Sequence, residues 1–275
     1  MKRRIAAILA SLSMAFPAVM TSAADIDTYE PSLYFVPAQT EGVSALPAGN
    51  LFVNNNDIPD GADIRTRIYY LDEMKATNML FAKWMCSSKE ITLTDLTDPV
   101  TETGASPYEK WSEKGSVPLL HKPDENFMAA SYTTITSAPL KLTGESTADY
   151  PIAAFTVSIP GNVPVGRYEV SFLTGEGSNV TSVSYSSPLR DIRPSGDNAR
   201  SLCIGVSDRA LGDVNGSGKL EATDASKLLV AYASLSGGGS SGLTLAEEIA
   251  GDMNGDGKLT ASDASAVLVK YADGQ

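Results

Sequence analysis

A duplicated segment near the C-terminus constrains this chain more than any other feature. The stretch GDVNGSGKLEATDAS at 212–226 recurs as GDMNGDGKLTASDAS at 251–265, and apolar residues that follow each copy match as well. Because self-similarity at a fixed period marks a repeated structural unit, the sequence predicts two copies of one small element. Between them lie a Gly- and Ser-rich stretch at 236–242, typical of a flexible loop, and a predicted short helix at 243–250.

Each copy has the spacing of a calcium-binding loop. Calcium takes six or more oxygen ligands, and a loop of twelve residues presents them from positions 1, 3, 5, 7, 9 and 12, with glycine at position 6. In the first copy these six positions are Asp213, Asn215, Ser217, Lys219, Glu221 and Asp224. In the second they are Asp252, Asn254, Asp256, Lys258, Thr260 and Asp263. The lysines offer only their backbone carbonyls. The sequence therefore predicts two bound calcium ions.

The two predicted sites differ in charge at position 5, where Ser217 corresponds to Asp256. Because ligand charge tunes calcium affinity, the second loop is expected to bind more tightly unless Glu221 compensates. Asp, Asn and Gly also cluster in ordinary turns, so one such match alone would be weak. Two matches in register, each followed by a helical pattern, favour calcium loops.

Each predicted loop ends in aspartate, Asp224 or Asp263, where a standard EF-hand has glutamate, and only a short segment at 207–212 precedes the first loop. A loop followed by a helix, duplicated and ending in Asp, resembles a type I dockerin over about residues 211–274. Dockerins attach cellulosomal proteins to cohesin modules of a scaffold protein, the scaffoldin. The resemblance therefore implies a calcium-dependent module with a cohesin as its partner.

Helical periodicity after each loop separates a core face from a second apolar surface. Ala225, Leu228 and Tyr232, and likewise Ala264, Val267 and Tyr271, recur at helical spacing and are expected to face the core. The pairs Leu229-Val230 and Leu268-Val269 widen this face, as part of a broader core or as a partner surface. The dockerin resemblance places partner recognition at Ala222, Thr223, Leu229, Val230 and Ser234, with Ala261, Ser262, Leu268, Val269 and Asp273 as the symmetric set.

The N-terminus reads as a secretory signal peptide over residues 1–24, with cleavage expected before Asp25. Basic residues at 2–4 precede an apolar run at 5–19 that ends in small residues. This run is shorter than the roughly twenty residues of a membrane-spanning helix. We therefore expect a secreted, extracellular protein associated with a cellulosome, without a membrane span. The formal net charge of -12 argues against nucleic acid as a partner, because no basic patch is available to neutralise phosphates.

Residues 25–206 have the pattern of a β-sandwich. Short β-branched and aromatic stretches alternate with Pro, Gly and Asn clusters. We expect strands at 33–36, 64–70, 79–85, 127–134, 140–143, 152–159, 168–173, 180–185 and 202–206, and a loop at 186–200. The predicted fold is mainly β: an N-terminal sandwich of jelly-roll or cohesin-like type, followed at 207–275 by a small α-helical dockerin with two calcium loops.

The stretch IAAFTVSIPGNVPVGRYEVSF at 152–172 is similar to a late strand-turn-strand unit of cohesin modules. This resemblance implies a small adaptor scaffoldin, in which the sandwich receives a dockerin-bearing protein and the dockerin attaches to another scaffold. One alternative is a module that binds plant cell-wall polysaccharide, such as cellulose, through exposed aromatics. Its candidates are Tyr69, Tyr70, Trp84, Tyr108 and Trp111, of which Trp84 is expected in the core and Trp111 at the surface.

A second alternative is a polysaccharide-degrading enzyme, which needs two carboxylates fixed across the scissile bond. No motif singles out such a pair, and no catalytic residue is assigned. Two cysteines, Cys86 and Cys203, exclude a disulfide-dense scaffold, and whether they pair is left open.

Overall fold

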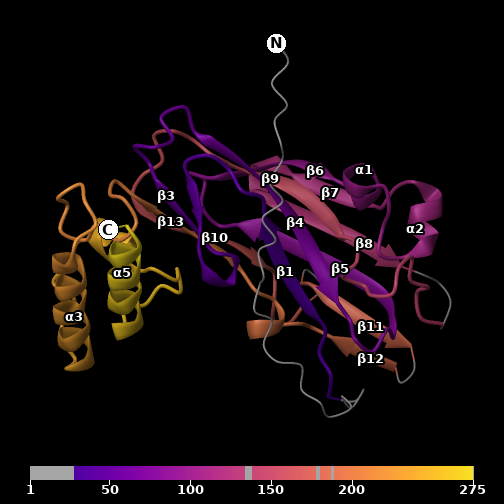
Figure 1. Cartoon of the computed structure of the whole chain (residues 1–275). Helices are drawn as coiled ribbons and strands as arrows, with labels where there is room; N and C mark the ends of the chain where they lie inside the picture. The colour runs from indigo at the N-terminus through magenta and orange to yellow at the C-terminus, as the bar shows by residue number, and fades with distance from the viewer. Residues whose placement is uncertain (1–27, 134–137, 178–179, 187–188, 275) are drawn as a thin grey trace.

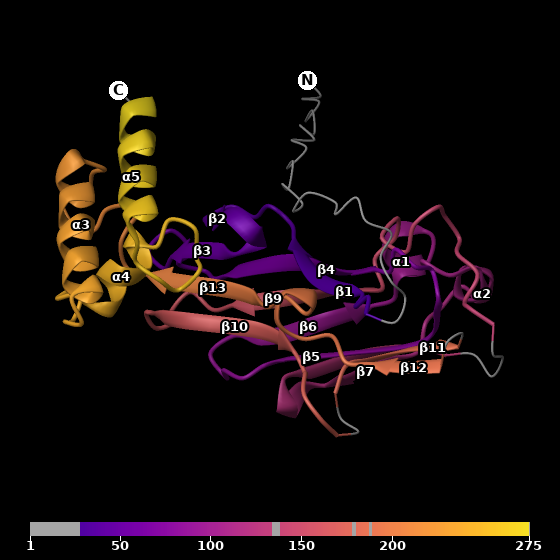
Figure 2. The same cartoon turned by 90° about the horizontal axis from the view of Figure 1, so that it is seen from below.

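The computed structural model describes residues 28–133, 138–177, 180–186 and 189–274. The predicted signal peptide lies outside these ranges. Figures 1 and 2 show a two-sheet sandwich with a group of helices at one end of it. None of the helices in the described part of the chain has the length and apolarity needed to span a bilayer.

One sheet of the sandwich has four antiparallel strands in the order β1-β4-β9-β6. Its strands are β1 (Ser32–Pro37), β4 (Ala62–Leu71), β6 (Thr92–Thr97) and β9 (Ala153–Ile159). Along β4, buried residues alternate with more exposed ones, because successive side chains of a strand point to opposite faces. Only one face of this strand therefore contributes to the sandwich core.

The other sheet has nine strands, and its main path runs β12-β11-β5-β10-β13-β3-β2, with β8 paired to β5 and to β7. The strands are β2 (Val43–Ala45), β3 (Leu51–Asn54), β5 (Thr77–Cys86), β7 (Leu119–Lys122), β8 (Phe127–Thr133), β10 (Gly166–Phe172), β11 (Ser182–Ser186), β12 (Leu189–Ile192) and β13 (Leu202–Ser207). β13 pairs with β3 in parallel and with β10 in antiparallel orientation. Trp84 and Phe155 meet in the core between the sheets, with ring centroids 5.7 Å apart.

Two short helices lie at the end of the sandwich opposite the helical group: α1 (Pro99–Thr103) and α2 (Glu109–Lys114). The side chain of Asp98 accepts hydrogen bonds from the backbone N–H groups of Val100 and Thr101, which satisfies free donors at the start of α1. Trp111 in α2 is 3% exposed and packs edge-on against Tyr132, with ring centroids 5.1 Å apart. The expectation of an exposed Trp111 is therefore wrong, because α2 turns this side chain into the core.

Most predicted strands are present, but the sequence did not mark β2, β3, β6 and β7, and three further details differ. Residues 140–143 form only an isolated bridge, between Leu142 and Tyr108, rather than a strand. The segment predicted as a loop at 186–200 contains β12, which pairs with β11 at the edge of the sheet. β9 and β10, adjacent in sequence, belong to different sheets, so the turn between them crosses the sandwich instead of closing a hairpin.

The C-terminal helices are α3 (Ala222–Ser236), α4 (Leu245–Gly251) and α5 (Ala261–Asp273). α3 and α5 pack against each other, and α4 contacts β13 and β10 of the sandwich. α4 begins with a reciprocal cap, in which the backbone N–H of Thr244 donates to Glu247 and the N–H of Glu247 donates to the Thr244 hydroxyl. The predicted fold class, a β-sandwich followed by a small helical module, is confirmed.

Candidate metal centres and partner-binding surface

Each repeat places a buried carboxylate at both ends of its loop. Asp213 and Asp224 are 4% and 0% exposed in the first loop, and Asp252 and Asp263 are each 1% exposed in the second. Buried carboxylates are costly unless they accept hydrogen bonds or face a cation. These four positions are the first and last predicted ligands of the two loops.

In the first loop, backbone N–H groups surround Asp213. Its Oδ1 accepts from Gly216 and Ser217 at 2.8 and 3.0 Å, and its Oδ2 accepts from Gly218 at 2.9 Å. Gly218, at position 6, has a φ of 77°, a left-handed conformation that favours glycine. The loop is therefore wound around its first carboxylate, as the predicted frame requires.

The last carboxylate of each loop also fixes the helix that follows. Asp224 Oδ2 accepts from the backbone N–H of Glu221 at 2.8 Å, and Asp263 Oδ2 accepts from that of Thr260 at 2.9 Å. Glu221 and Thr260 are the N-cap residues of α3 and α5. Position 12 of each loop is thus also the third residue of a helix, so loop and helix form one unit.

The second loop closes in the same way around Asp252. The Oδ1 of Asp252 accepts from Asp256 N–H at 3.1 Å, and its Oδ2 accepts from Gly257 N–H at 2.9 Å. It differs from the first loop in a charged contact to this carboxylate: Arg167 Nη1, from β10 of the sandwich, lies 2.6 Å from Asp252 Oδ2. Burial raises the pKa of Asp252, although the hydrogen bond and charge of Arg167 act in the opposite direction.

The donor set suits calcium better than a transition metal. Among the described residues, no group of three or more His, Cys, Asp or Glu side chains is arranged to hold a metal. Each loop instead combines carboxylates with amide, hydroxyl and backbone oxygens, which calcium accepts. Asp213 and Asp224, both buried, form no ion pair with a Lys or Arg of the described chain. A bound cation would compensate their charge.

The other predicted ligands lie along the same two loops. Asn215 Oδ1 and Asn254 Oδ1 each accept from the backbone N–H two residues later. The backbone carbonyl of Lys219 accepts from the Ser217 hydroxyl, and Lys258 N–H donates to Asp256. The Glu221 carboxylate accepts from the Thr223 hydroxyl at 3.4 Å, a contact on the outside of the loop. The structure therefore does not single out Glu221 as compensating for Ser217.

The core of the helical module contains Val214, Ala225, Leu228, Ala231, Leu259, Ala264 and Val267. Tyr232, predicted in this core, is 37% exposed, and Ala231 is buried in its place. Helical spacing allows either residue, and the small side chain of Ala231 permits close packing of α3 against α5. Tyr271 is half-buried. The prediction for Tyr232 is therefore wrong.

The two apolar pairs lie on the outer surface of the module. Leu229 and Val230 are 46% and 71% exposed, and Leu268 and Val269 are 43% and 61% exposed. The remaining residues of the predicted recognition set are exposed as well: Ala222, Thr223, Ser234, Ala261, Ser262 and Asp273. The exposure of these pairs excludes the first interpretation from the sequence, a broader core. They form an exposed apolar surface, and its role in partner binding stays a prediction.

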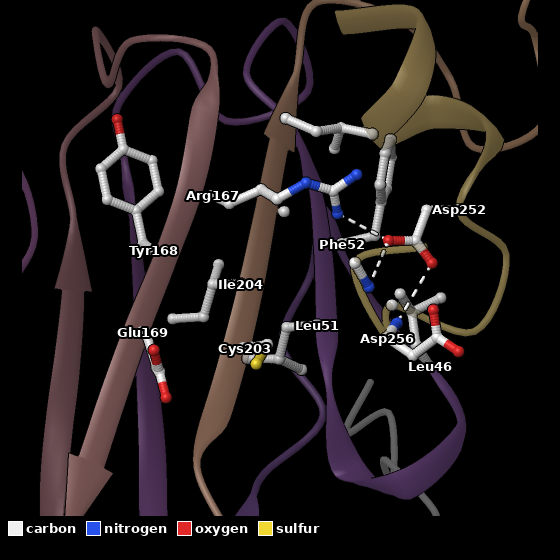
Figure 3. Close-up of a pocket in the computed structure, with 14 residues that line it drawn as sticks. Leu46, Leu51, Phe52, Arg167, Tyr168, Glu169, Cys203, Ile204, Asp252 and Asp256 are labelled. Atoms are coloured by element: carbon white, nitrogen blue, oxygen red, sulfur yellow. Dashed lines mark hydrogen bonds and ion pairs between the residues drawn. The ribbon is translucent and has the colours of Figure 1, made fainter. Parts of the chain in front are cut away.

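The module also contacts the sandwich through residues that the sequence did not mark. Ile249 and Ala250 of α4 are buried with Leu46 and Phe52 of the sandwich. Asn50 Nδ2 donates to the carbonyl of Gly255 in the second loop at 2.9 Å, and the Ser207 hydroxyl donates to Ala246 O at 2.9 Å. A cleft of about 210 Å³ remains between this loop and strands β3, β10 and β13 (Figure 3).

The aromatic candidates for a sugar-binding surface do not form an exposed row. Tyr70, Trp84, Tyr108 and Trp111 are all buried, at 3% exposure or less. Tyr69, which is half-buried, stacks on Tyr34 with ring centroids 5.8 Å apart. Cys86 and Cys203 are both free, and burial raises the pKa of each thiol.

Comparison with known proteins gives one match by sequence. Residues 211–270 match the family model of the dockerin type I domain. No curated protein matches the chain.

Solved structures to which the chain is similar include several cohesins. The seventh ScaB type I cohesin from Pseudobacteroides cellulosolvens has 12% identity and a TM-score of 0.35, over 55% of this chain and 86% of that chain. A type III cohesin module from the cellulosomal ScaE cell-surface anchoring scaffoldin of Ruminococcus flavefaciens has 10% identity and a TM-score of 0.38, over 66% and 89%. A chain of the Coh-OlpA-Doc918 complex from Clostridium thermocellum has 11% identity and a TM-score of 0.36, over 64% and 99%. Identities and TM-scores this low assign no activity to the sandwich.

The family match and the geometry of the helical module define the class of this protein: it carries a module that docks onto another protein. That module, over residues 211–270, is a type I dockerin. Type I dockerin domains bind calcium.

Proposed function

We propose that this chain is a secreted cellulosome component whose dockerin, within residues 207–275, docks onto a cohesin of a scaffoldin in a calcium-dependent manner. The observation that carries this proposal is the exposure of Leu229-Val230 and Leu268-Val269 at matching positions of the two repeats. Exposed apolar clusters on a small module mark interaction sites, because water-exposed apolar surface is removed on binding. The type I dockerin match supports a cohesin as the partner.

In this proposal each loop binds one calcium ion, so the module carries two. Asp213, Asn215, Ser217, Lys219, Glu221 and Asp224 would hold the first ion, and Asp252, Asn254, Asp256, Lys258, Thr260 and Asp263 the second. Support comes from the buried carboxylates at both ends of each loop and from the left-handed glycines at position 6. The calcium would compensate carboxylates that the fold buries and so hold α3 and α5 in their packed arrangement.

For residues 25–206 we propose the role of an adaptor cohesin that receives a dockerin-bearing protein, with no catalytic activity of its own. Support comes from the two-sheet architecture and from the cohesin-like sequence at 152–172. The burial of Trp111 and of most other candidate aromatics removes the observation that favoured polysaccharide binding. The chain would then link a dockerin-bearing protein to a scaffold.

A capture experiment tests the dockerin end of the chain. The full-length protein is applied to immobilised type I cohesin modules in calcium and in EDTA. We expect retention in calcium only, and equal retention in EDTA would contradict the calcium dependence.

The sandwich is tested with a full-length variant in which all four exposed apolar residues become aspartate, so that the dockerin surface is disabled. We expect this variant to retain dockerin-bearing enzymes and not insoluble cellulose or xylan. Retention on the polysaccharide without capture of a dockerin would contradict the adaptor role.

A further inference from the structure

Arg167 joins the sandwich to the first ligand position of the second calcium loop. Its Nη1 lies 2.6 Å from Asp252 Oδ2, and the Asp252 side chain is 1% exposed whereas that of Arg167 is 35% exposed. In Figure 3 the arginine side chain extends from β10 toward the loop and ends at this carboxylate. A charged hydrogen bond to a buried carboxylate is among the stronger polar contacts in proteins.

Neighbouring contacts hold the loop in reach of Arg167. Asn50 donates to the carbonyl of Gly255 inside the loop, and its Oδ1 accepts from the Cys203 N–H of β13 at 3.2 Å. On the preceding helix, Ile249 is 2% exposed and packs with Phe52. The arginine contact is therefore part of a fixed interface between the module and the sandwich.

Among the described residues, no side-chain cation pairs with a predicted ligand of the first loop as Arg167 does with Asp252. Asp213 occupies the same position in its loop and accepts from backbone N–H groups. Two cations lie near this loop, Arg209 and Lys227, and both donate to the carbonyl of Val214 and pair with Glu247 rather than with a predicted ligand. Two loops of nearly the same sequence thus have different electrostatic surroundings.

Arg167 changes the charge at the second loop. Each loop supplies three carboxylates among its predicted ligands, Asp213, Glu221 and Asp224 or Asp252, Asp256 and Asp263, together with one lysine. The guanidinium adds a positive charge beside the second set, where it repels an incoming divalent cation. It also donates to an oxygen, Asp252 Oδ2, that already accepts from Gly257 N–H. Both effects disfavour calcium at this loop.

We propose that Arg167 is an internal cation that competes with calcium for the second loop, so that the sandwich sets the affinity of this site. The second site is then the weaker one, opposite to the order that the loop sequences predict. Because coupling between two binding events is reciprocal, calcium in the second loop weakens the Arg167–Asp252 contact by the same factor. This inference rests on the calcium binding proposed above.

Calcium titration of the full-length protein against a competing chromophoric chelator tests the proposal. The wild type is expected to show two unequal affinities, and Arg167→Ala should tighten the weaker one by about tenfold, because a positive charge that repels the incoming cation is removed. Arg200→Ala is the matched control, because Arg200 is an exposed sandwich arginine that contacts only Asp197 O and Leu33 O. The control should leave both affinities unchanged.

Two further variants assign the affected site. In an Asp213→Ala background the titration reports the second loop, and Arg167→Ala should still tighten binding; in an Asp252→Ala background the arginine change should have no effect. If these backgrounds do not fold, the titrations of the wild type and of Arg167→Ala are compared directly. The proposal expects one of the two calcium affinities to change and the other to stay the same. Unchanged or weaker binding in Arg167→Ala overturns the proposal and makes Arg167 a structural or ligand-orienting residue. A wild type that binds no calcium overturns the proposed calcium dependence as well.

Discussion

At the scale of single residues, buried carboxylates organise both parts of the chain. In the sandwich, Asp72 follows β4 and is 1% exposed. It accepts hydrogen bonds from the backbone of Met74 and Ala76, from the backbone and hydroxyl of Thr77, and from the Tyr185 hydroxyl of β11. One side chain thereby joins the turn between β4 and β5 to a strand of the other sheet. The Asp72 carboxylate accepts five hydrogen bonds, whereas that of Asp213 accepts three and that of Asp224 two.

Replacing Asp72 by alanine should destabilise the sandwich by about 3 kcal/mol, because several buried donors lose their acceptor at once. Urea unfolding followed by tryptophan fluorescence measures this, since both tryptophans, Trp84 and Trp111, lie in the sandwich core. Asp63→Ala removes an exposed carboxylate from β4 and should cost less than about 0.5 kcal/mol. Equal losses in the two variants would show that the Asp72 contacts do not stabilise the fold.

The twelve-residue frame places Asp213, Asp224, Asp252 and Asp263 at the ends of the two loops, and all four side chains are buried there. Their role as calcium ligands stays a prediction. Tyr232 and Trp111 were misplaced because helical spacing leaves neighbouring positions ambiguous. In both cases the packing partner, which the local sequence does not show, decided which residue is buried.

At the scale of elements, each calcium loop and the helix that follows it form one unit through Asp224 or Asp263. The core that these units share contains seven buried apolar residues, a small number against the conformational entropy of ordering three helices. It also surrounds four buried carboxylates. Metal binding can supply the missing stabilisation, since ligands of this kind come together only in the folded state.

We therefore expect chelation to unfold the helical module selectively. In the full-length protein, EDTA should abolish most of the helical circular dichroism while tryptophan fluorescence of the sandwich stays unchanged. Readdition of calcium should restore the helical signal, and magnesium at the same concentration serves as the control. A module that remains equally helical in EDTA would contradict this account.

The long strands could be predicted from sequence, and the short ones could not. β4 alternates buried with more exposed residues over its ten positions, and β5 does so from Met79 onward, which gives a clear period of two. β2, β3, β7 and β12 have only three or four residues, too few for a recognisable period. β6 has six residues but an irregular burial pattern, and its register against β9 shifts between Thr94 and Thr97. The pairing of β9 and β10 with different sheets depends on distant strands, so local turn residues could not reveal it.

At the scale of the whole molecule, the dockerin is held against the sandwich by α4 and by its second loop. Arg167 and Asn50 reach the second loop from positions 85 and 205 residues away in sequence. Nothing in their local sequence marks them, so this interface could not be predicted before the fold was known. It makes the two halves of an internally repeated module inequivalent, while the apolar pairs of both repeats remain exposed.

The claim that the chain docks through Leu229-Val230 and Leu268-Val269 is tested by calorimetric titration against a type I cohesin in calcium. The titrated proteins are the wild type, a variant with Leu229 and Val230 changed to aspartate, one with Leu268 and Val269 changed, and one with all four changed. Because the repeats are nearly identical, either pair can serve as the anchor, so each two-residue variant should keep most of the affinity. The four-residue variant should lose several kcal/mol of binding free energy, as loss of a central apolar anchor does. Its helical circular dichroism and calcium affinity should match those of the wild type; full cohesin affinity in that folded variant would contradict the claim.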